Sequence, residues 1–433
     1  MESKPLLVFE GPAGSRSGYG ERARDLLRAL IAIDKYDIKI VSTRWGNTPM
    51  NALTDKDEDI YSRLLTENLT QQPEIYMQVT VPNEFRTMGK YNIGVTAGIE
   101  TTVCDPSWLE GCNRMDMVLV SSNHAKQVFE QTVFDKRDQN TNNLLGQLKL
   151  TTPVEVLFEG VRTDKFNKTY TPGTEVETLF KDIKEDFCFL FVGHWLQGDF
   201  GEDRKNISGL IRAFLDGFKN KQNAPALILK TSGGAVSIVD RDTILSKIEI
   251  IKNSIDSKVL PNIYLAYGDF DESEMNTLYN HPKVKAHVSF TKGEGFGRPL
   301  IEAAMTAKPI IASNWSGHLD FLSPETSVLI DGQLTNVHPS AQWKGVINEG
   351  SQWFTVDYGK GIGYMKDVFK NYKIYLEKSR KTNHHIKTNF SFEAMKVKLS
   401  EYMSRVPEFP KQAQIKLPQL KKIELPKLKK IEA

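Results

Sequence analysis

Residues 292–322 read KGEGFGRPLIEAAMTAKPIIASNWSGHLDFL, and the rest of the chain is best understood in relation to this stretch. It opens with a turn in which three positions lack a Cβ, so that the backbone can approach a ligand closely: Gly293, Gly295 and Gly297. Pro299 suits the first turn of a helix, and the sequence predicts a short Ala-rich helix over 300–307 and a buried strand over 309–312. A helix that follows a glycine turn presents free N–H groups, so the stretch is typical of an anion site.

Two carboxylates stand at opposite ends of this element, Glu294 in the turn and Glu302 within the predicted helix. Seven residues separate them, about two helical turns, so they can reach the two ends of an elongated ligand. Carboxylates accept hydrogen bonds, which suits a sugar and a ribose with a diphosphate between them. The alternative is that Glu302 only solvates its helix and that Glu294 is an ordinary turn residue. The surrounding GEGFGRPLIEA favours the ligand-binding interpretation.

The pattern GEGFG-x-P-x-x-EA, followed by KPIIAS and WSG, resembles the donor-site signature of family four of the retaining glycosyltransferases. Members of that family have the two-domain GT-B fold. The resemblance is densest over 293–322, continues more weakly from Val8 to Leu399, and does not cover the last thirty or so residues. It implies that Glu294 contacts the transferred sugar and that Glu302 contacts the ribose of the nucleotide. It also places the diphosphate and sugar on the backbone of four consecutive residues: Gly295, Phe296, Gly297 and Arg298.

The length, composition and charge of the chain limit the number of domains and the kinds of partner that we expect. A chain of 433 residues is long for one core and sufficient for two domains, and 40% hydrophobic and 25% charged residues are ordinary for a soluble globular protein. The net charge is +2, but residues 411–433 carry seven Lys and two Glu, a net charge of +5, which leaves −3 on the body. The body therefore has no overall basic bias toward nucleic acid.

Cysteine usage and the absence of apolar runs predict a cytoplasmic protein. Cys104, Cys112 and Cys188 form no CxxC pair and have no zinc-site spacing, so we expect three buried, reduced thiols. The sequence contains no recognisable signal peptide and no apolar run long enough to span a bilayer. Any membrane association is expected to be peripheral, on the cytoplasmic face.

The N-terminus predicts an α/β domain, with a strand over 5–10, a glycine loop and a helix over 21–33. Residues 18–23 satisfy G-x-G-x-x-A, a dinucleotide-binding pattern, but the following strand, 38–41, runs into STRW and lacks the acidic residue that would hold a ribose. The absence of this acidic residue therefore argues against a dehydrogenase. The resemblance instead places Gly18 and Gly20 near the donor phosphates and the acceptor.

Further along, the run from Ile99 to Phe129 is similar to a stretch that family members place against the interdomain cleft. Glu100 lies in the loop at the end of the predicted strand 91–97, where catalytic or acceptor-binding groups usually sit. Many relatives have a histidine near this point and this sequence does not. Glu100 is therefore either a catalytic-site residue or a solvated loop carboxylate.

The second domain is predicted to begin with the apolar strand 187–192 and a long loop, GHWLQGDFGEDRKN, before a helix over 207–217. Relatives carry a basic residue and a Lys in this loop that grip the diphosphate. Here His194 replaces the first cation, and Arg204 and Lys205 are the candidates that remain, unless both are simply solvated. Lys230 ends the strand 226–230 at the edge where ligands collect. In relatives the turn that begins at Tyr267 frames the nucleotide base.

Alternating strands and helices in both halves predict an α/β protein in which two doubly wound parallel sheets face one another, with the donor site in the cleft between them. The expected parts are an acceptor-side domain over 1–170, a donor domain over 185–385, a closing helix over 386–410 that packs back on the first domain, and a tail over 411–433. Residues 353–375 and 392–403 are predicted to form the closing helices. In the first domain, strands are also predicted over 75–79 and 117–120, and a polar helix and connector over 51–72.

The tail contains an eight-residue repeat, LPQLKKIE at 417–424 and LPKLKKIE at 425–432. Proline every eight residues prevents one long helix. The tail is therefore either an extended strap or basic arm, or a tether to a partner or an anionic surface.

Together these features predict a retaining glycosyltransferase that moves a sugar from a nucleoside-diphosphate sugar to a hydroxyl of a glycan, lipid-linked, protein or other acceptor, in glycan or glycoconjugate synthesis. Lys205, Arg204 and the amides after Gly297 would stabilise the leaving group. No carboxylate cluster has metal spacing, so neither a metal nor another cofactor is expected. The alternatives are a sugar-nucleotide-binding scaffold without turnover and a GT-B sugar-nucleotide epimerase.

Overall fold

The computed structural model describes residues 4–138, 140–172, 175–234 and 236–409, so the tail prediction for 411–433 lies outside the described residues. The first domain is built on a sheet of six parallel strands in the order β2-β1-β3-β4-β5-β8. Its strands are β1 (Leu6–Gly11), β2 (Asp37–Ser42), β3 (Ile75–Val79), β4 (Tyr91–Thr96), β5 (Met117–Val120) and β8 (Val154–Val156). Its helices are α1 (Gly18–Ile33), α2 (Glu58–Tyr61), α3 (Pro106–Cys112) and α4 (Asn123–Gln131).

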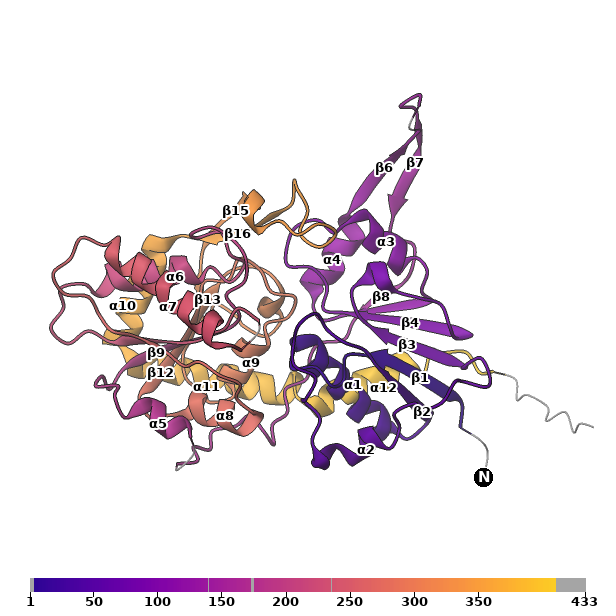
Figure 1. The fold of residues 1–433 in the computed structure, drawn as a ribbon, viewed down its shortest axis with the longest axis horizontal. Coiled ribbons are helices and arrows are strands. Elements are labelled where there is room, and N and C mark those ends of the chain that lie inside the picture. The colour runs from indigo at the N-terminus through magenta and orange to yellow at the C-terminus, as the bar shows by residue number, and fades with distance from the viewer. Residues whose placement is uncertain (1–3, 139, 173–174, 235, 410–433) are drawn as a thin grey trace, which may run out of the picture.

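The second domain repeats this architecture with six parallel strands in the order β11-β10-β9-β12-β13-β14 (Figure 1). Its strands are β9 (Cys188–Val192), β10 (Ala226–Lys230), β11 (Ile263–Leu265), β12 (Val284–Ser289), β13 (Ile310–Ser313) and β14 (Val328–Ile330). Its helices are α5 (Val176–Phe180), α6 (Ile207–Phe218), α7 (Ile238–Asn253), α8 (Glu272–Asn280), α9 (Arg298–Ala304), α10 (Tyr358–Lys370) and α11 (Tyr372–Asn389). Two parallel, doubly wound sheets confirm the predicted fold class.

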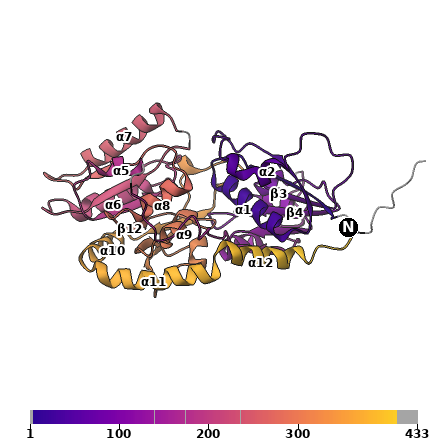
Figure 2. The same cartoon turned by 90° about the horizontal axis from the view of Figure 1, so that it is seen from below.

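The chain crosses between the domains at two points that lie side by side. Val161 donates its N–H to the carbonyl of Phe390 (2.9 Å), and Phe392 donates its N–H to the carbonyl of Val161 (2.9 Å). Helix α12 (Phe392–Met403) then runs along the first domain, while α11 runs along the second (Figure 2). The Tyr402 hydroxyl donates to the carbonyl of Val156 (2.9 Å) and fixes α12 to the edge of the first sheet.

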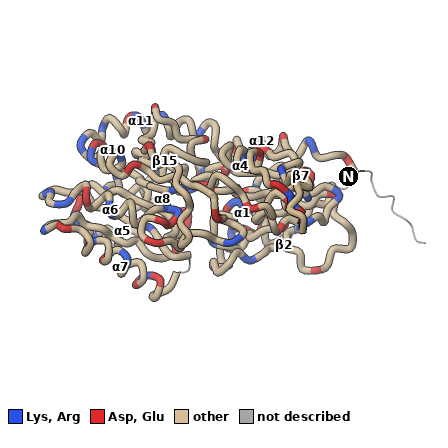
Figure 3. Tube along the Cα trace, turned by 90° about the horizontal axis from the view of Figure 1, so that it is seen from above, with Lys and Arg blue, Asp and Glu red and all other residues tan. Residues whose placement is uncertain are grey.

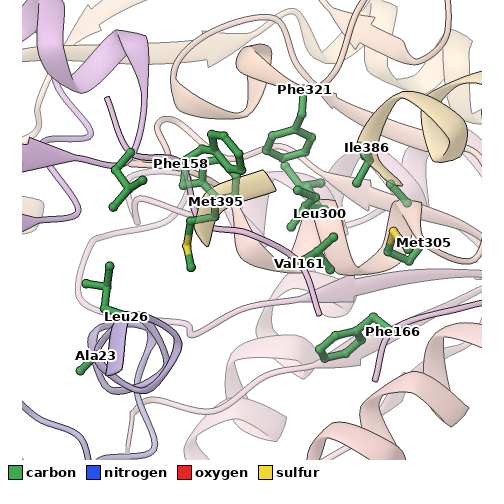
Figure 4. Close-up of a cluster of buried hydrophobic side chains, with 14 of the residues drawn as sticks. Ala23, Leu26, Phe158, Val161, Phe166, Leu300, Met305, Phe321, Ile386 and Met395 are labelled. Atoms are coloured by element: carbon green, nitrogen blue, oxygen red, sulfur yellow. The ribbon is translucent and has the colours of Figure 1, made fainter. Parts of the chain in front are cut away.

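One apolar cluster continues through both domains. Ala23 and Leu26 of α1 and Met395 of α12 belong to the same buried cluster as Leu300 and Phe321 of the second domain (Figure 4). A shared apolar core of this kind favours a fixed arrangement of the two domains over independent motion. Acidic and basic residues are interspersed over both domains (Figure 3).

Several local predictions are wrong. Residues 353–375 do not begin as a helix, because β16 (Gln352–Val356) pairs antiparallel with β15 (Gly332–Asn336) and α10 starts only after Asp357, whose side chain accepts from the N–H of Lys360. The polar helix and connector predicted for 51–72 are correct only in part, because the helical portion is limited to the short η1 (Asp55–Asp57) and α2. The hairpin of β6 (Val133–Arg137) and β7 (Leu144–Lys149), which projects from the first domain in Figure 1, was not predicted.

Cys104, Cys112 and Cys188 are buried and form no disulfide, as the sequence predicts. Burial raises the pKa of Cys104 and of Cys188 to about 12, so these thiols stay protonated near neutral pH. Within the described ranges, no helix is both long enough and apolar enough to cross a membrane. The residue boundaries that we gave for the domains stay predictions.

Candidate functional site

The second sheet places two loops at one point. Its strand order reverses between β9 and β12, the topological switch point where ligands bind in open α/β sheets. The loop 193–206 follows β9, and the glutamate-containing loop 290–297 follows β12, so both lie at the carboxyl ends of adjacent strands. The sequence patterns identified these two loops separately, and the topology brings them together.

Local contacts fix the loop before α6. The Asp203 carboxylate accepts the N–H of Ile207 (3.1 Å) and the hydroxyl of Ser208 (3.3 Å), which holds the first turn of α6. The carbonyl of Arg204 accepts the N–H of Lys292 (2.7 Å), and the Arg204 guanidinium donates to the carbonyl of Gly293 (2.9 Å). The loop is thus fastened to the glutamate loop.

Glu294 and Lys205 form the closest charge pair of the site. Lys205 Nζ lies 2.5 Å from Glu294 Oε1, and Arg204 Nη1 lies 3.5 Å from Glu294 Oε2. Burial alone would raise the pKa of Glu294, but Lys205 and Arg204 outweigh it and lower that pKa to about 2. Burial lowers the pKa of Lys205, against the opposing effect of Glu294. The Glu294 carboxylate is therefore ionised. Its partner Lys205 is a cation whose burial costs desolvation free energy.

Glu100 of the first domain joins this cluster. Its carboxylate lies 3.6 Å from Arg204 Nη1, so Arg204 stands between Glu100 and Glu294. Burial would lower the pKa of Arg204, but the two carboxylates raise it. All four residues that we expected to be catalytic therefore lie at one place. The catalytic role of Glu100 stays a prediction.

The glycines of the turn face the other domain. A Cβ at Gly293 would lie 2.0 Å from the carbonyl oxygen of Glu100, and one at Gly295 would lie 2.7 Å from that of Ala97. The close approach that glycine permits is here between the two domains. Gly297 has a φ of 100°, which favours glycine, and it precedes α9. The side chain of Phe296 is buried against Phe321 (ring centroids 5.1 Å apart) and anchors the turn.

The side chain of Arg298 points to the first domain. It lies 2.9 Å from Asp25, 3.3 Å from Glu159 and 3.4 Å from Glu21, and 3.7 Å from Glu302 on its own helix. These four carboxylates are the ion-pair partners of its side chain in the described structure. That the backbone of Arg298 helps to hold the diphosphate and sugar stays a prediction. Sequence reasoning missed the three carboxylates of the first domain. The only available signal was that Glu21 and Asp25 are four residues apart and so share one face of α1.

Glu302 is buried at the domain interface. Its carboxylate accepts the hydroxyl of Tyr279 (3.2 Å). Burial, together with the negative charge of Glu21, raises the pKa of Glu302 to about 8, although Arg298 and Tyr279 act in the opposite direction. Glu302 is thus at the far end of α9 from Glu294, as the spacing predicts, and its burial beside Glu21 favours the protonated form of the carboxyl.

Lys230 and Tyr267 lie at the carboxyl edge of the sheet but are engaged differently. Lys230 Nζ donates to the carbonyl of Gly268 (2.6 Å) and sits over the ring of Phe270 (4.5 Å). Burial lowers the pKa of His194, and the charges of Lys205 and Lys230 lower it further. The Nδ1 of His194 lies 3.1 Å from the hydroxyl of Ser232. The hydroxyl of Tyr267 donates to Asp240 (2.7 Å) at the start of α7. Substrate contacts by Lys230 and Tyr267 stay predictions.

Gly18 and Gly20 have different surroundings in the first domain. A Cβ at Gly20 would lie 2.1 Å from the carbonyl oxygen of Ser15, so glycine is needed for the loop to fold against α1, whereas a Cβ at Gly18 would extend into open space. Between them, the Tyr19 hydroxyl accepts the N–H of Ala97 (3.1 Å). The glycine loop is therefore connected, through Ala97, to the turn that carries Glu294.

Over the described part of the chain, no group of three or more His, Cys, Asp or Glu residues is arranged to hold a metal ion. The site is instead an array of alternating carboxylates and cations across two domains. Such an array can bind an anion through Arg204 and Lys205 and can accept hydrogen bonds through Glu294 and Glu302.

Comparison with known proteins shows the fold. No protein-family profile matches the chain, and no curated protein is similar to it in sequence. Sucrose-phosphate synthase from Thermosynechococcus elongatus is similar in structure, with a TM-score of 0.60, 12% identity and coverage of 93% of this chain and 99% of that one. A glycosyltransferase from Rickettsia africae ESF-5 has a TM-score of 0.60 at 14% identity, and covers 94% of this chain and 99% of its own. HepE from Anabaena, solved with UDP and glucose, has a TM-score of 0.59 at 11% identity, with 92% and 99% covered. The chain therefore has the GT-B fold.

Proposed function

We propose that this protein transfers a sugar from a nucleoside-diphosphate sugar to a hydroxyl acceptor. The observation that carries the proposal is the meeting of Glu294, Lys205 and Arg204 at the switch point of the second sheet, with Lys205 Nζ 2.5 Å from Glu294. Similarity in fold to a sucrose-phosphate synthase and to HepE, which was solved with UDP and glucose, supports the choice of a nucleotide sugar as donor.

The charges suit the departure of a nucleoside diphosphate. When the bond between the sugar and the phosphate breaks, negative charge grows on the leaving group. Lys205 is a buried cation and Arg204 a partly buried one, and both lie just before α6, where the dielectric is lower than in water. A diphosphate would take the place of Glu294 as their partner, and the freed carboxylate would accept hydroxyls of the sugar.

Two finer statements belong to the proposal and rest on the resemblance to family four. The first is retention of configuration at the anomeric carbon without a protein nucleophile. The second is that the reaction needs no metal, because Lys205 and Arg204 would balance the charge of the diphosphate.

The proposal is tested by thermal shift with UDP-, GDP- and ADP-sugars, followed by NMR of the products. A donor present at one hundred times its dissociation constant stabilises the protein by about 2.7 kcal/mol. We expect one nucleotide class to stabilise the protein and its sugar to be transferred to a hydroxyl, or slowly to water, with the anomeric configuration kept. Binding without turnover would indicate a scaffold, and an epimerised sugar nucleotide would indicate an epimerase. No stabilisation by any donor would refute the proposal.

A further inference from the structure

A cluster of charged side chains at the domain interface surrounds Arg298, whose side chain is 13% exposed. Three of its four carboxylate partners belong to the first domain: Glu21 and Asp25 on α1, and Glu159 in the segment after β8. The fourth is Glu302, one turn along α9. Arg298 therefore connects the helix that carries Glu302 to the opposite domain.

Glu21 and Glu302 both lie near the Nε of Arg298, which donates a hydrogen bond to neither of them. Arg298 Nε lies 3.4 Å from Glu21 Oε2 and 3.7 Å from Glu302 Oε1. The two oxygens are therefore at most about 7 Å apart, and like charges at that separation repel, here between the buried Glu302 and the partly exposed Glu21. Burial would raise the pKa of Glu21, but Arg298 and neighbouring arginines outweigh it and lower that pKa. Of the two carboxyls, Glu302 is the one whose protonated form this arrangement favours.

The other charged groups around Glu302 are already engaged. From α8, Tyr279 donates to Glu302, and Glu272 is paired with Arg162 at 3.3 Å. Asp25 and Glu159 bind Arg298 rather than Glu302. Arg24 and Arg28 act on Glu21 from its own helix. The groups that oppose each other directly at Glu302 are thus Glu21 and Arg298.

We propose that Glu21 and Arg298 are opposed positioning residues for Glu302: Arg298 favours the ionised carboxylate that accepts ribose hydroxyls, and Glu21 opposes it from the other domain. The inference rests on the proposed function, in which Glu302 holds the ribose of the donor. Because one residue of the pair lies on α1 and the other on α9, nucleotide binding is linked both to the approach of the domains and to the release of a proton. Affinity for the nucleotide then rises with pH until Glu302 is ionised.

The test is calorimetric titration of the full chain with UDP, GDP and ADP at about pH 6.5 and about pH 9, using the nucleotide that binds the wild type. Glu21→Gln removes the opposing charge and should strengthen binding about three- to tenfold at the lower pH, with little change at the higher pH. Arg298→Gln should weaken binding about tenfold or more at the lower pH, and Arg298→Lys should restore part of the loss. Glu302→Gln, which cannot ionise, should remove the pH dependence.

Asp25→Asn is the matched control, because Asp25 is the closest partner of Arg298 and yet does not contact Glu302. It should loosen the interface and keep the pH dependence of the wild type. If Glu21→Gln and Arg298→Gln both strengthened or both weakened nucleotide binding at the lower pH, this inference would be overturned and the proposed function would stay intact. The same holds if neither variant altered the pH dependence of nucleotide affinity. If none of the three nucleotides bound the wild type at either pH, the proposed function would fall and this inference with it.

Discussion

Lys205→Met tests the charge pair at the centre of the site. Methionine keeps much of the length of lysine but has no charge, so the variant leaves the Glu294 carboxylate buried 2.5 Å from where its closest cation was. Breaking a buried pair by removing one partner typically costs about 3–5 kcal/mol. Arg204 stays 3.5 Å from the other oxygen of Glu294, so we expect a loss near the lower end, about 3 kcal/mol of unfolding free energy.

The lowered pKa of Glu294 gives a similar magnitude for the unfolding free energy that depends on this charge pair. It falls from 4.5 to about 2 in spite of burial, and each unit corresponds to about 1.4 kcal/mol, so the ionised carboxylate contributes about 3 kcal/mol near neutral pH. A carboxyl whose pKa is lowered on folding contributes this stability above pH 4.5 and loses it as the pH falls toward 2. Burial lowers the pKa of Lys205, so the pair as a whole adds less than the Glu294 figure. Removing both charges should therefore be milder than removing one.

The assay is urea unfolding of the wild type, Lys205→Met, Glu294→Gln and the double variant, at neutral pH and at about pH 3. The double variant should recover most of the loss of Lys205→Met, with a coupling energy of about 1.5–3 kcal/mol. Lys219→Met is the matched control, since Lys219 pairs with Asp216 at 3.0 Å on the surface and should lose less than about 1 kcal/mol. If Lys205→Met proved as mild as Lys219→Met, or if the two single losses simply added, the coupling that we infer would be refuted.

Three further outcomes are expected. Glu302→Ala should weaken binding of both donor and free nucleoside diphosphate by about 1.5–3 kcal/mol, whereas Glu294→Ala should lower turnover and spare nucleoside diphosphate affinity. Calorimetry separates the two, and equal losses would contradict the division of roles. Treatment with EDTA should leave turnover unchanged, and an activity that Mg²⁺ restores would argue against metal independence. Deletion of 411–433, which removes a net charge of +5, should leave turnover on a small acceptor unchanged. If the tail is a tether, binding to anionic vesicles should fall on truncation and should weaken with salt in the intact protein. If the tail is a strap, truncation should instead lower the melting temperature.

Some elements with strong local signals were predictable to the residue, whereas the bounds predicted for β1, β9 and α9 differ by one to three residues from those observed. The apolar runs of β3, β5 and β10 and the helix α12 have the bounds that the sequence indicates. Each has its own local cause, such as the Ser391 side chain that accepts the N–H of Ala394 and starts α12. A fully buried parallel strand is also a continuous apolar run, so its pattern does not depend on its neighbours.

Elements that depend on a distant partner were not predictable in this way. QWFTV, residues 352–356, resembles the start of an apolar helix until β15 is available to pair with it across Gly332–Asn336. The projecting hairpin has a mixed polar sequence and exposes Leu144 and Leu145, so it lacks the alternation that marks a half-buried strand. In both cases the pairing decides the structure, and pairing is not a local property.

The site residues also fall into two groups, those that local sequence patterns predict and those that depend on contacts between distant parts of the chain. Within the second domain, Glu294, Lys205 and Arg204 come from two loops whose patterns are informative by themselves, and the strand order then places them together. The partners of Arg298 come from the other domain, and its closest, Asp25, is 273 residues away in the chain. No pattern around Arg298 contains that information, because it depends on how the two sheets dock.

The glycine turn illustrates why a correct pattern can still mislead about its cause. Absence of a Cβ at Gly293 fits a ligand-binding turn, yet a Cβ there would lie 2.0 Å from the carbonyl oxygen of Glu100 in the facing domain. Alanine at this position would therefore push the domains apart whether or not a donor binds. A loss of activity in such a variant would not identify a phosphate contact. Only a measurement on the nucleotide itself, such as its affinity with and without the diphosphate, separates a residue that touches the donor from one that lets the domains meet.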